Sequence, residues 1–345
     1  MSKKPFIYDI DLPDLNEQLS TWNVPTFRSL QIWQGLYKQL WNTTEQFTML
    51  PQSFRLQLAE TYDFTHLQVM EDLQSTDGET HKILFQLPDG HPVEAVWMGY
   101  EKRNTLCIST QSGCAMGCVF CATGQMGFRR NLSSGEIVEQ VMFYARRLAQ
   151  AGKQVTNIVV MGMGEPFLNY EATLAAIDRL NAPDGFNLGT RRFTISTVGL
   201  VPFIRRFSNE HRQINLAVSL HAAEDELRTP LLPINRKYNL DELFDACREY
   251  VMKTNRRITF EYALIGGVND TPEHARQLGR RISGLLCHVN IIQLNPTRGY
   301  PGKASSREHA RSFQFELQKL NIPCTIRLRR GIDIHAGCGQ LAGRN

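Results

Sequence analysis

The sequence predicts an α/β fold: a partial barrel of six β/α units, preceded by a small helical domain and a β extension. From residue 104 onward, six strand-like segments alternate with helical patterns, which is typical of a parallel sheet with helices along it. Residues 66 to 100 instead resemble consecutive strands with a Pro-Asp-Gly turn. The first 75 residues carry only short helical patterns. We therefore divide the chain into 1–75, 76–103 and 104–345.

Three helical patterns make up the first part, at residues 12–24, 28–40 and 50–62. In each of them apolar residues recur at three- and four-residue spacing, and Pro, Thr or Asn separates them. The tryptophans of this part are Trp22, Trp33 and Trp41. Such a bundle suits an RNA-binding accessory domain. The alternative is that the tryptophans form its core, and we favour this for Trp33.

The predicted barrel contains six strands and five helices. The strands lie at 105–110, 155–162, 191–199, 214–221, 256–265 and 288–296. Four helices lie at 170–181, 239–253, 271–284 and 305–320, and the first has Ile137, Val141, Tyr144 and Leu148 on one face. Ser133 and Glu136 have the spacing of a capping box at the start of that first helix.

Unusual polar or glycine-rich residues follow the predicted strands. In a β/α barrel the chemistry lies where the C-terminal ends of the strands open into loops. At these ends lie a cysteine-rich loop, the segment GMGEP (162–166), Ser196, the run Ser219-Leu220-His221, and Asn295. All of them fall at one rim, so we expect the functional site there.

The loop after the first strand holds Cys114, Cys118 and Cys121, a C-x3-C-x2-C run. A structural zinc site usually needs four ligands, whereas each thiolate of an iron–sulfur cluster binds one iron. Three ligands for a 4Fe–4S cluster leave one iron open to a ligand with nitrogen and oxygen donors. The spacing resembles that of the radical S-adenosylmethionine (SAM) enzymes, in which the methionine end of SAM fills this place. The alternatives are three ordinary thiols or an incomplete zinc site.

The GMGEP segment suits close contact with a bound ligand. Its glycines let the backbone approach SAM, so Gly164 can pair with the amino group and Glu165 can add a carboxylate. Ser196, Ser219 and Asn295 carry hydroxyl or amide groups able to hold ribose or carboxylate oxygens. The alternatives are a tight turn before Pro166 and ordinary caps at strand ends.

Two further cysteines are candidates for thiol chemistry. Cys107 lies on the first barrel strand, and Cys338 lies in a glycine-containing tail that suits a mobile segment. A partly exposed thiol is a candidate nucleophile, because the thiolate is the reactive form. The alternative is that both are buried or incidental cysteines. The remaining ones, which we interpret as structural, are Cys247, Cys287 and Cys324.

Composition and charge narrow the cellular setting and the partners. The N-terminus lacks the apolar run of a signal peptide, and no later stretch stays apolar for a bilayer crossing, so we expect a cytoplasmic protein without membrane contact. Eight cysteines in such a chain favour metal or redox chemistry over a disulfide framework. The net charge is +4, and arginine doublets recur at 129–130, 191–192, 205–206, 256–257, 280–281 and 329–330. They would bind RNA if gathered on one face, or else they are surface charges paired with acids.

Several motifs in order resemble the RlmN/Cfr family of radical SAM RNA methyltransferases. Beside the cysteine run they are ATGQMGFRRNL, GMGEPFLNY, TISTVG, AVSLHA with PINRKY, IIQLNP and RRGIDIHAGCGQLAG. The similarity runs from about residue 90 to the C-terminus. It implies methylation of an adenine ring carbon in the peptidyl-transferase region of 23S rRNA and, for the RlmN branch, in tRNA on the 3′ side of the anticodon. One departure is Gly337, where the family more often has Ala.

The resemblance also implies a mechanism. Cys338 is methylated by one SAM, and a second SAM on the cluster is reductively cleaved to a 5′-deoxyadenosyl radical. This radical takes a hydrogen from the methyl group, and the carbon radical adds to adenine. Glu94 is then the base for the ring proton, and Cys107 attacks the sulfur of Cys338, which releases product and forms a disulfide. The alternative for Glu94 is a solvent-facing strand residue.

RlmN-type enzymes methylate carbon 2 and Cfr-type enzymes, which confer antibiotic resistance, methylate carbon 8. Pro166 after the GMGE glutamate and Pro296 after Asn295 resemble RlmN, so we favour carbon 2. Two other hypotheses are a radical SAM enzyme with a non-RNA substrate and a non-enzymatic iron–sulfur RNA-binding regulator. From the family we also expect a reducing protein such as flavodoxin, and we expect a monomer.

Overall fold

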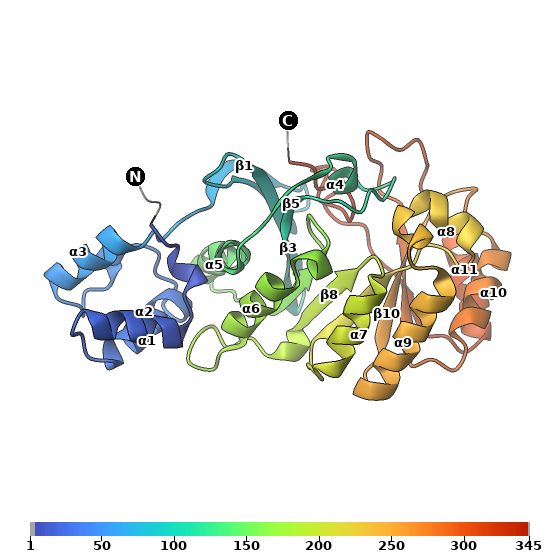
Figure 1. The fold of residues 1–345 in the computed structure, drawn as a ribbon. Helices are drawn as coiled ribbons and strands as arrows, with labels where there is room; N and C mark the ends of the chain where they lie inside the picture. Colours follow the sequence, from blue (N-terminus) through green and yellow to red (C-terminus); the bar gives the residue numbers. More distant parts are fainter. Residues whose placement is uncertain (1–3, 344–345) are drawn as a thin grey trace.

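A computed structural model describes residues 4–343 and contains one ten-stranded mixed sheet (Figure 1). The strand order is β1-β2-β3-β4-β7-β8-β9-β10-β11-β12. The bounds are β1 Gln68–Gln74, β2 Thr80–Gln86, β3 Pro92–Tyr100, β4 Arg103–Cys107, β7 Asn157–Val160, β8 Phe193–Thr197, β9 Asn215–Ser219, β10 Ile258–Leu264, β11 Cys287–Gln293 and β12 Cys324–Ile326. The first four strands pair antiparallel, and every pair from β4 to β12 is parallel.

The six predicted barrel strands are confirmed as β4 and β7 to β11. Their register brings the C-terminal ends together, for example Cys107 opposite Val159 and Val160 opposite Ile195. The structure adds β12 at the edge next to β11, which the sequence did not indicate. The result is an open parallel sheet of seven strands continued by an antiparallel extension.

The predicted helices of the barrel are confirmed, and two further helices of nine and seven residues occur between them. The confirmed ones are α5 Ser134–Gln150, α6 Tyr170–Asn181, α9 Leu240–Thr254, α10 Pro272–Ile282 and α11 Arg307–Lys319. The additional ones are α7 Val201–Asn209 and α8 Asp225–Leu231. Figure 1 shows α6, α7 and α9 along one face of the sheet. The capping box at Ser133 and Glu136 is present, since each side chain accepts the backbone N–H of the other residue.

The β extension begins earlier than the predicted boundary at residue 76. Strand β1 lies before that boundary, pairs with β2, and thus belongs to the sheet. Its side chains are mostly exposed, and it lies within residues 66 to 100, which the sequence predicts to be consecutive strands. The helical domain therefore ends at Leu67, and the sheet begins at Gln68.

The N-terminal helical domain packs against the barrel. Its elements are η1 Ile7–Asp9, α1 Leu12–Thr21, α2 Phe27–Tyr37, η2 Thr44–Gln46 and α3 Gln52–Thr61. Trp33 is 3% exposed, which confirms its place in the core. Asp9 accepts a 2.6 Å hydrogen bond from the backbone N–H of Gly135, where a Cβ would lie 2.7 Å from the Asp9 nitrogen. The apolar core runs without a break from this domain into the barrel.

A small ladder encloses the cysteine-rich loop. It consists of β5 Gln111–Gly113 and β6 Phe128–Asn131, with the short helix α4 Ala122–Gln125 between them. Figure 1 shows the C-terminal segment beside α4. None of the helices within residues 4–343 has the length and apolar composition needed to cross a bilayer.

Candidate active site

A cavity of about 170 Å³ lies at the C-terminal ends of the barrel strands. Ten predicted site residues line it: Cys114, Cys118, Cys121, Gly164, Glu165, Ser196, Ser219, His221, Asn295 and Cys338. Cys107 lines a smaller neighbouring cavity of about 50 Å³, which it shares with Cys338. Glu94 and Leu220 line neither cavity, and both are buried. Most of the predicted site residues therefore lie together at the C-terminal ends of the barrel strands, as the sequence predicts.

The three clustered cysteines are free thiols on one wall of the larger cavity. Burial raises the pKa of Cys114 to about 12 and also raises the pKa of Cys118, with the neighbouring Cys121 as a second cause. Among the described residues, no three His, Cys, Asp or Glu side chains converge on a single metal ion. A 4Fe–4S cluster does not need that convergence, because each thiolate binds a different iron. The iron charge would also stabilise thiolates at these buried positions.

The GMGEP segment passes very close to the first barrel strand and its loop. A Cβ at Gly164 would lie 2.6 Å from Cβ of Gln111, and the residue has φ +103°. The Glu165 carboxylate accepts the backbone N–H groups of Phe167 at 3.0 Å and Val198 at 2.8 Å. Burial nevertheless raises the pKa of Glu165 to about 7. The carboxylate thus ties the loop after β7 to the loop after β8.

Replacing Gly164 by alanine should damage both this loop and the fold. We expect a loss of roughly 3 kcal/mol or more in the free energy of unfolding, from backbone strain plus contact with Gln111. Gly267→Ala is the matched control, because Gly267 has φ +73° but nothing lies within 4 Å of its Cβ position. That variant should lose about 1 kcal/mol. Urea unfolding of both variants measures the difference, and equal losses would contradict the close approach described here.

The loop after β9 is held by a buried histidine and a buried arginine. Nδ1 of His221 accepts the backbone N–H of Ala263 at 2.9 Å, and burial lowers the pKa of His221 to about 3, so the ring is neutral. The Arg228 side chain is fully buried and donates to the carbonyl oxygens of Leu220 at 3.1 Å and Val198 at 2.7 Å. Leu220 therefore contributes its backbone to this site.

Arg228 was not among the predicted site residues. It fixes the ends of β8 and β9, and its charge acts on Cys118 across the wall of the larger cavity. Arg228 lies eleven residues after Ala217 of the AVSLHA motif, and nothing in the sequence around it distinguishes it from the other arginines. Those are mostly at the surface, so a buried one could not be expected from the sequence. A fully buried arginine that acts on Cys118 is visible only in the folded structure.

The tail from Gly337 to Ala342 closes one side of both cavities. The Thr123 hydroxyl donates a hydrogen bond to the carbonyl oxygen of Leu341 at 2.5 Å. The backbone N–H of Ala122 donates to the carbonyl oxygen of Gly339 at 2.7 Å. The side-chain amide of Asn295 donates to the Cys338 carbonyl at 3.1 Å. A Cβ at Gly337 would lie 2.5 Å from Asn295 Nδ2, so an alanine there would require the amide side chain to shift.

Cys107 and Cys338 face each other across the smaller cavity. Cys107 lies on β4, and Cys338 is exposed on the tail. Burial and the nearby Cys338 raise the pKa of Cys107 to about 12, and Arg327 opposes that effect. Arg327 lines both cavities and was not predicted. The sequence left open which way the Cys107 side chain points, and in the structure it lies on the side of the tail thiol.

Glu94 lies on β3 and meets the tail from the other side. One carboxylate oxygen lies 3.1 Å from Nζ of Lys82, and the other accepts the backbone N–H of Ala342 at 2.9 Å. The residue is 3% exposed, so the alternative of a solvent-facing strand residue is wrong. It contacts the tail four residues beyond Cys338.

Comparison with known proteins places this site in a family. The Radical SAM superfamily model matches residues 108–278. The chain is 49% identical to the dual-specificity RNA methyltransferase RlmN 1 of Myxococcus xanthus, over 97% of this chain and 93% of that protein. A probable RlmN of Chloroflexus aurantiacus is 48% identical over 98% of this chain and 93% of its own. The chain belongs to the RlmN family of radical SAM RNA methyltransferases.

A solved structure agrees with this membership. The crystal structure of a radical SAM methyltransferase from Sphaerobacter thermophilus matches with a TM-score of 0.97 and 49% identity, over 99% of this chain and 100% of that one. The fold predicted from the sequence is thus confirmed as a radical SAM fold. The cofactors of this superfamily are a 4Fe–4S cluster and SAM, as the cysteine run indicated.

The arginine doublets of this RlmN-family chain divide into three groups. Arg205, Arg206, Arg280 and Arg281 form ion pairs with acids on the outer helices. The doublets 191–192 and 256–257 directly precede β8 and β10, at the rim opposite the cavity. Only 129–130 and 329–330 border the cysteine loop and the tail. The alternative of paired surface charge is thus correct for the outer helices.

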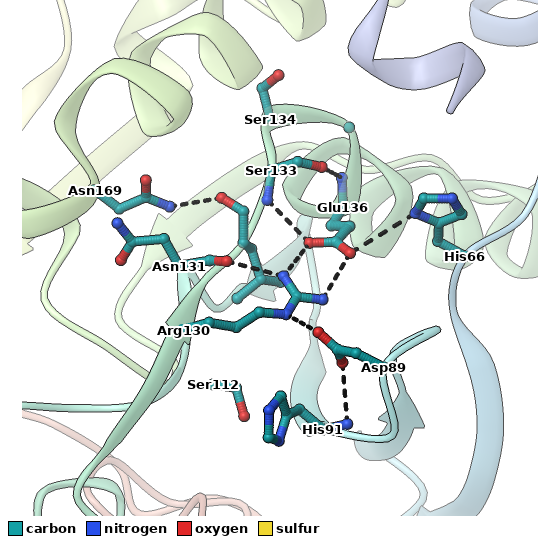
Figure 2. Close-up of polar contacts among 12 residues, drawn as sticks. His66, Asp89, His91, Ser112, Arg130, Asn131, Ser133, Ser134, Glu136 and Asn169 are labelled. Carbon is teal, nitrogen blue, oxygen red and sulfur yellow. Dashed lines mark hydrogen bonds and ion pairs between the residues drawn. The ribbon is translucent and has the colours of Figure 1, made fainter. Parts of the chain in front are cut away.

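Arg130 joins three separate segments behind the cysteine loop (Figure 2). Its guanidinium pairs with Asp89 of the β2–β3 turn and with the Glu136 carboxylate at 2.7 Å. His66 Nδ1 lies 3.7 Å from that carboxylate, and the His66 ring stacks on Phe6 with ring centres 3.9 Å apart. The network therefore fixes β6, α5 and the end of the helical domain to one another.

This network should make the fold sensitive to acid. Burial alone would raise the pKa of Glu136, but the nearby His66 ring and the hydrogen bonds from Arg130 and the Ser133 backbone lower it to about 2. The ionised group therefore stabilises the fold above its unfolded pKa, and this contribution is lost as the pH falls toward 2. We expect the wild type to lose about 2 kcal/mol more than Glu136→Gln between about pH 6 and pH 3. Urea unfolding of both proteins at the two pH values measures these losses in free energy of unfolding. Equal losses in the wild type and in Glu136→Gln would contradict a stabilising role of the ionised Glu136.

Proposed function

We propose that this chain methylates carbon 2 of an adenine in 23S rRNA and in tRNA, through a methylated Cys338 and a transient Cys107–Cys338 disulfide. The observation that carries this proposal is the position of the Cys338 thiol. It lines the same cavity as the three clustered cysteines and, on its other side, the cavity that holds Cys107. The relatives named RlmN are dual-specificity RNA methyltransferases.

The residues of the larger cavity have separate roles in this proposal. Cys114, Cys118 and Cys121 hold the 4Fe–4S cluster, and the remaining wall holds SAM through Gly164, Glu165, Ser196, the segment 219–221 and Asn295. When bound, these cofactors supply the one-electron cleavage that makes a carbon radical. The Glu165 carboxylate, which already accepts two backbone N–H groups, also suits an ammonium group of the ligand.

The two thiols and Glu94 complete the reaction. Cys338 carries the methyl-derived carbon, and Glu94 accepts the ring proton of the adenine. The Cys107 thiolate then attacks the Cys338 sulfur, and the C–S bond breaks toward carbon, which takes up a proton to become the methyl group. The adenine must leave its helix to reach the rim. Of the arginines near that rim, the exposed Arg129 suits the RNA backbone, whereas Arg130 and Arg330 are already paired with acidic side chains.

Two residues favour carbon 2 over the Cfr-type carbon 8. Pro166 is the first residue of a short helix after Glu165, and Pro296 accepts a hydrogen bond from Gln340 of the tail at 3.0 Å. Mass spectrometry of RNA digests after reaction with the anaerobic, reconstituted protein separates 2-methyladenosine from 8-methyladenosine. We expect 2-methyladenosine in both 23S rRNA and tRNA. The 8-methyl isomer would favour the Cfr-type reading, and unmodified RNA with active SAM cleavage would favour a non-RNA substrate.

The proposal includes the setting of the reaction. Residues 1–75 form an accessory domain for RNA, 76–103 a connecting β extension and 104–345 the catalytic part. A cytoplasmic monomer, reduced by a protein such as flavodoxin, carries out the cycle. Light scattering with and without RNA measures the molar mass, which should be that of a monomer. The rate of SAM cleavage with reduced flavodoxin as the sole electron donor tests whether such a protein can reduce the cluster.

A further inference from the structure

A buried ion pair joins β2 and β3 next to the tail. Lys82 Nζ lies 3.1 Å from Glu94 Oε1, and the two side chains are 8% and 4% exposed. The register sets Lys82 opposite Val96 and Glu94 opposite Leu84, which makes the two charged residues diagonal neighbours on one face of the sheet. Lys82 Nζ also donates to the carbonyl of His335 at 3.2 Å, three residues before Cys338. One ammonium group thus contacts both the candidate base and the tail.

We propose that Lys82 is a positioning residue for methyl transfer, which keeps the Glu94 carboxylate ionised and oriented beside the tail. The proposal rests on the proposed function, in which Glu94 accepts the ring proton. Only an ionised carboxylate can accept that proton. A carboxylate that is 3% exposed loses most of its hydration, so it stays charged only with a compensating partner.

Stability alone does not account for the pair. Removing two charges from water costs free energy, and apolar residues of similar volume often replace a buried ion pair without loss. The cross-strand partners of Lys82 and Glu94 on the same face of the sheet, Val96 and Leu84, are apolar and buried, so apolar side chains flank the ion pair. A pair retained in such surroundings is more consistent with a role in the reaction.

Among the charged side chains near Glu94, Lys82 is the one that forms an ion pair with its carboxylate within residues 4–343. Besides Lys82, the elements packed against β3 carry several titratable residues: His81 of β2, Arg103 and Cys107 of β4, Glu136, Glu139, Tyr144, Arg146 and Arg147 of α5, and His335 and Cys338 of the tail. Within residues 4–343, the Lys82 ammonium is the only cation paired with the Glu94 carboxylate. The hydroxyl group of Tyr144 donates instead to the carbonyl of Ala95 at 2.9 Å.

The two oxygens of Glu94 have different partners, and this indicates how the base becomes available. Oε1 is paired with Lys82, whereas Oε2 accepts the backbone N–H of Ala342. Movement of the tail toward a substrate frees Oε2 and leaves Oε1 paired. The proton then passes from the ring carbon to Oε2, the electrons of the C–H bond stay in the ring, and the one excess electron of the radical adduct would leave to the iron–sulfur cluster of the proposed function. Lys82 remains charged throughout.

The test compares single-turnover methylation of 23S rRNA transcript by the reconstituted wild type, Lys82→Met, Lys82→Gln, Lys82→Arg and Glu94→Gln over about pH 6 to 9. Methionine and glutamine remove the charge, glutamine keeps hydrogen bonding, and arginine keeps the charge. We expect both uncharged variants to be slow at neutral pH and to recover by about tenfold per pH unit, while arginine restores the wild-type profile. The covalent RNA–protein adduct, seen on denaturing gels, should accumulate at low pH.

A second measurement does not depend on turnover. The infrared carboxylate band that Glu94→Gln removes should be present at neutral pH in the wild type and absent in Lys82→Gln. If the uncharged variants are slowed by one factor at every pH and keep that band, Lys82 acts through packing alone and the proposal is overturned. If Glu94→Gln methylates at the wild-type rate, the assignment of the base itself is wrong, whatever Lys82 does.

Discussion

Cys338→Ala abolishes methyl transfer while the cluster and SAM cleavage remain. We expect 2-methyladenosine to fall by more than about 1,000-fold, because no other thiol of the tail can carry the carbon to the base. Cys338 is exposed and its side chain makes no hydrogen bond among the described residues, so alanine should leave the fold intact. Mass spectrometry of RNA digests measures the product, and 5′-deoxyadenosine from the same reaction measures SAM cleavage.

The control for this experiment is Cys324→Ala, which removes a free cysteine on β12 that lines neither cavity. It should retain product formation. Cys107→Ala is a third variant, and it should leave the RNA covalently attached through Cys338, because the attack that releases it is missing. Full activity of Cys338→Ala would contradict the proposed function and would agree with the iron–sulfur regulator hypothesis instead.

Cys118→Ala removes the cluster and with it all SAM cleavage. In the proposed site each of the three cysteines would be the sole protein ligand of one iron, so loss of one would leave too few thiolates to retain the 4Fe–4S cluster. We expect the iron content and the brown absorbance of anaerobically reconstituted protein to drop to a small fraction of the wild type. Without the cluster, no 5′-deoxyadenosine forms.

Cys287→Ser, at a buried position on β11 outside both cavities, tests whether any lost thiol has the same effect. It should keep iron and sulfide even if the fold becomes less stable, since Cys287 lies among apolar core residues. A Cys118→Ala protein that binds as much iron as the wild type and still cleaves SAM would remove the basis of the site described here.

Much of the fold follows from the sequence, because its signals are local. The six barrel strands are short apolar runs bounded by turns, and α5 begins at a capping box. Of the elements that were not predicted, α7 does carry a signal, with Val201, Ile204 and Phe207 buried at three-residue spacing, whereas α8 and β12 lack one. Helix α8 contains Pro230 and buries mainly Arg228 and Leu231, so it has no apolar stripe. Strand β12 has three residues, too few for a pattern.

The site divides in the same way. The cysteines and the residues at strand ends could be predicted, since their positions depend on chain order alone. Arg228, Arg327 and Lys82 could not, because each acts on a residue far away in the sequence and only the packed structure brings the two together. Charged residues that are normally expected at the surface are the ones that sequence patterns miss.

The continuous core between the helical domain and the barrel determines how this enzyme can be dissected. Phe6, Ile7 and Tyr8 are buried, and Gly135 at the start of α5 has no room for a side chain because η1 lies against it. A truncation that starts at residue 66 would leave this surface of the barrel bare and prone to aggregation. The RNA recognition that we propose for the first helices is therefore better separated from catalysis by point changes on their outer faces than by deletion.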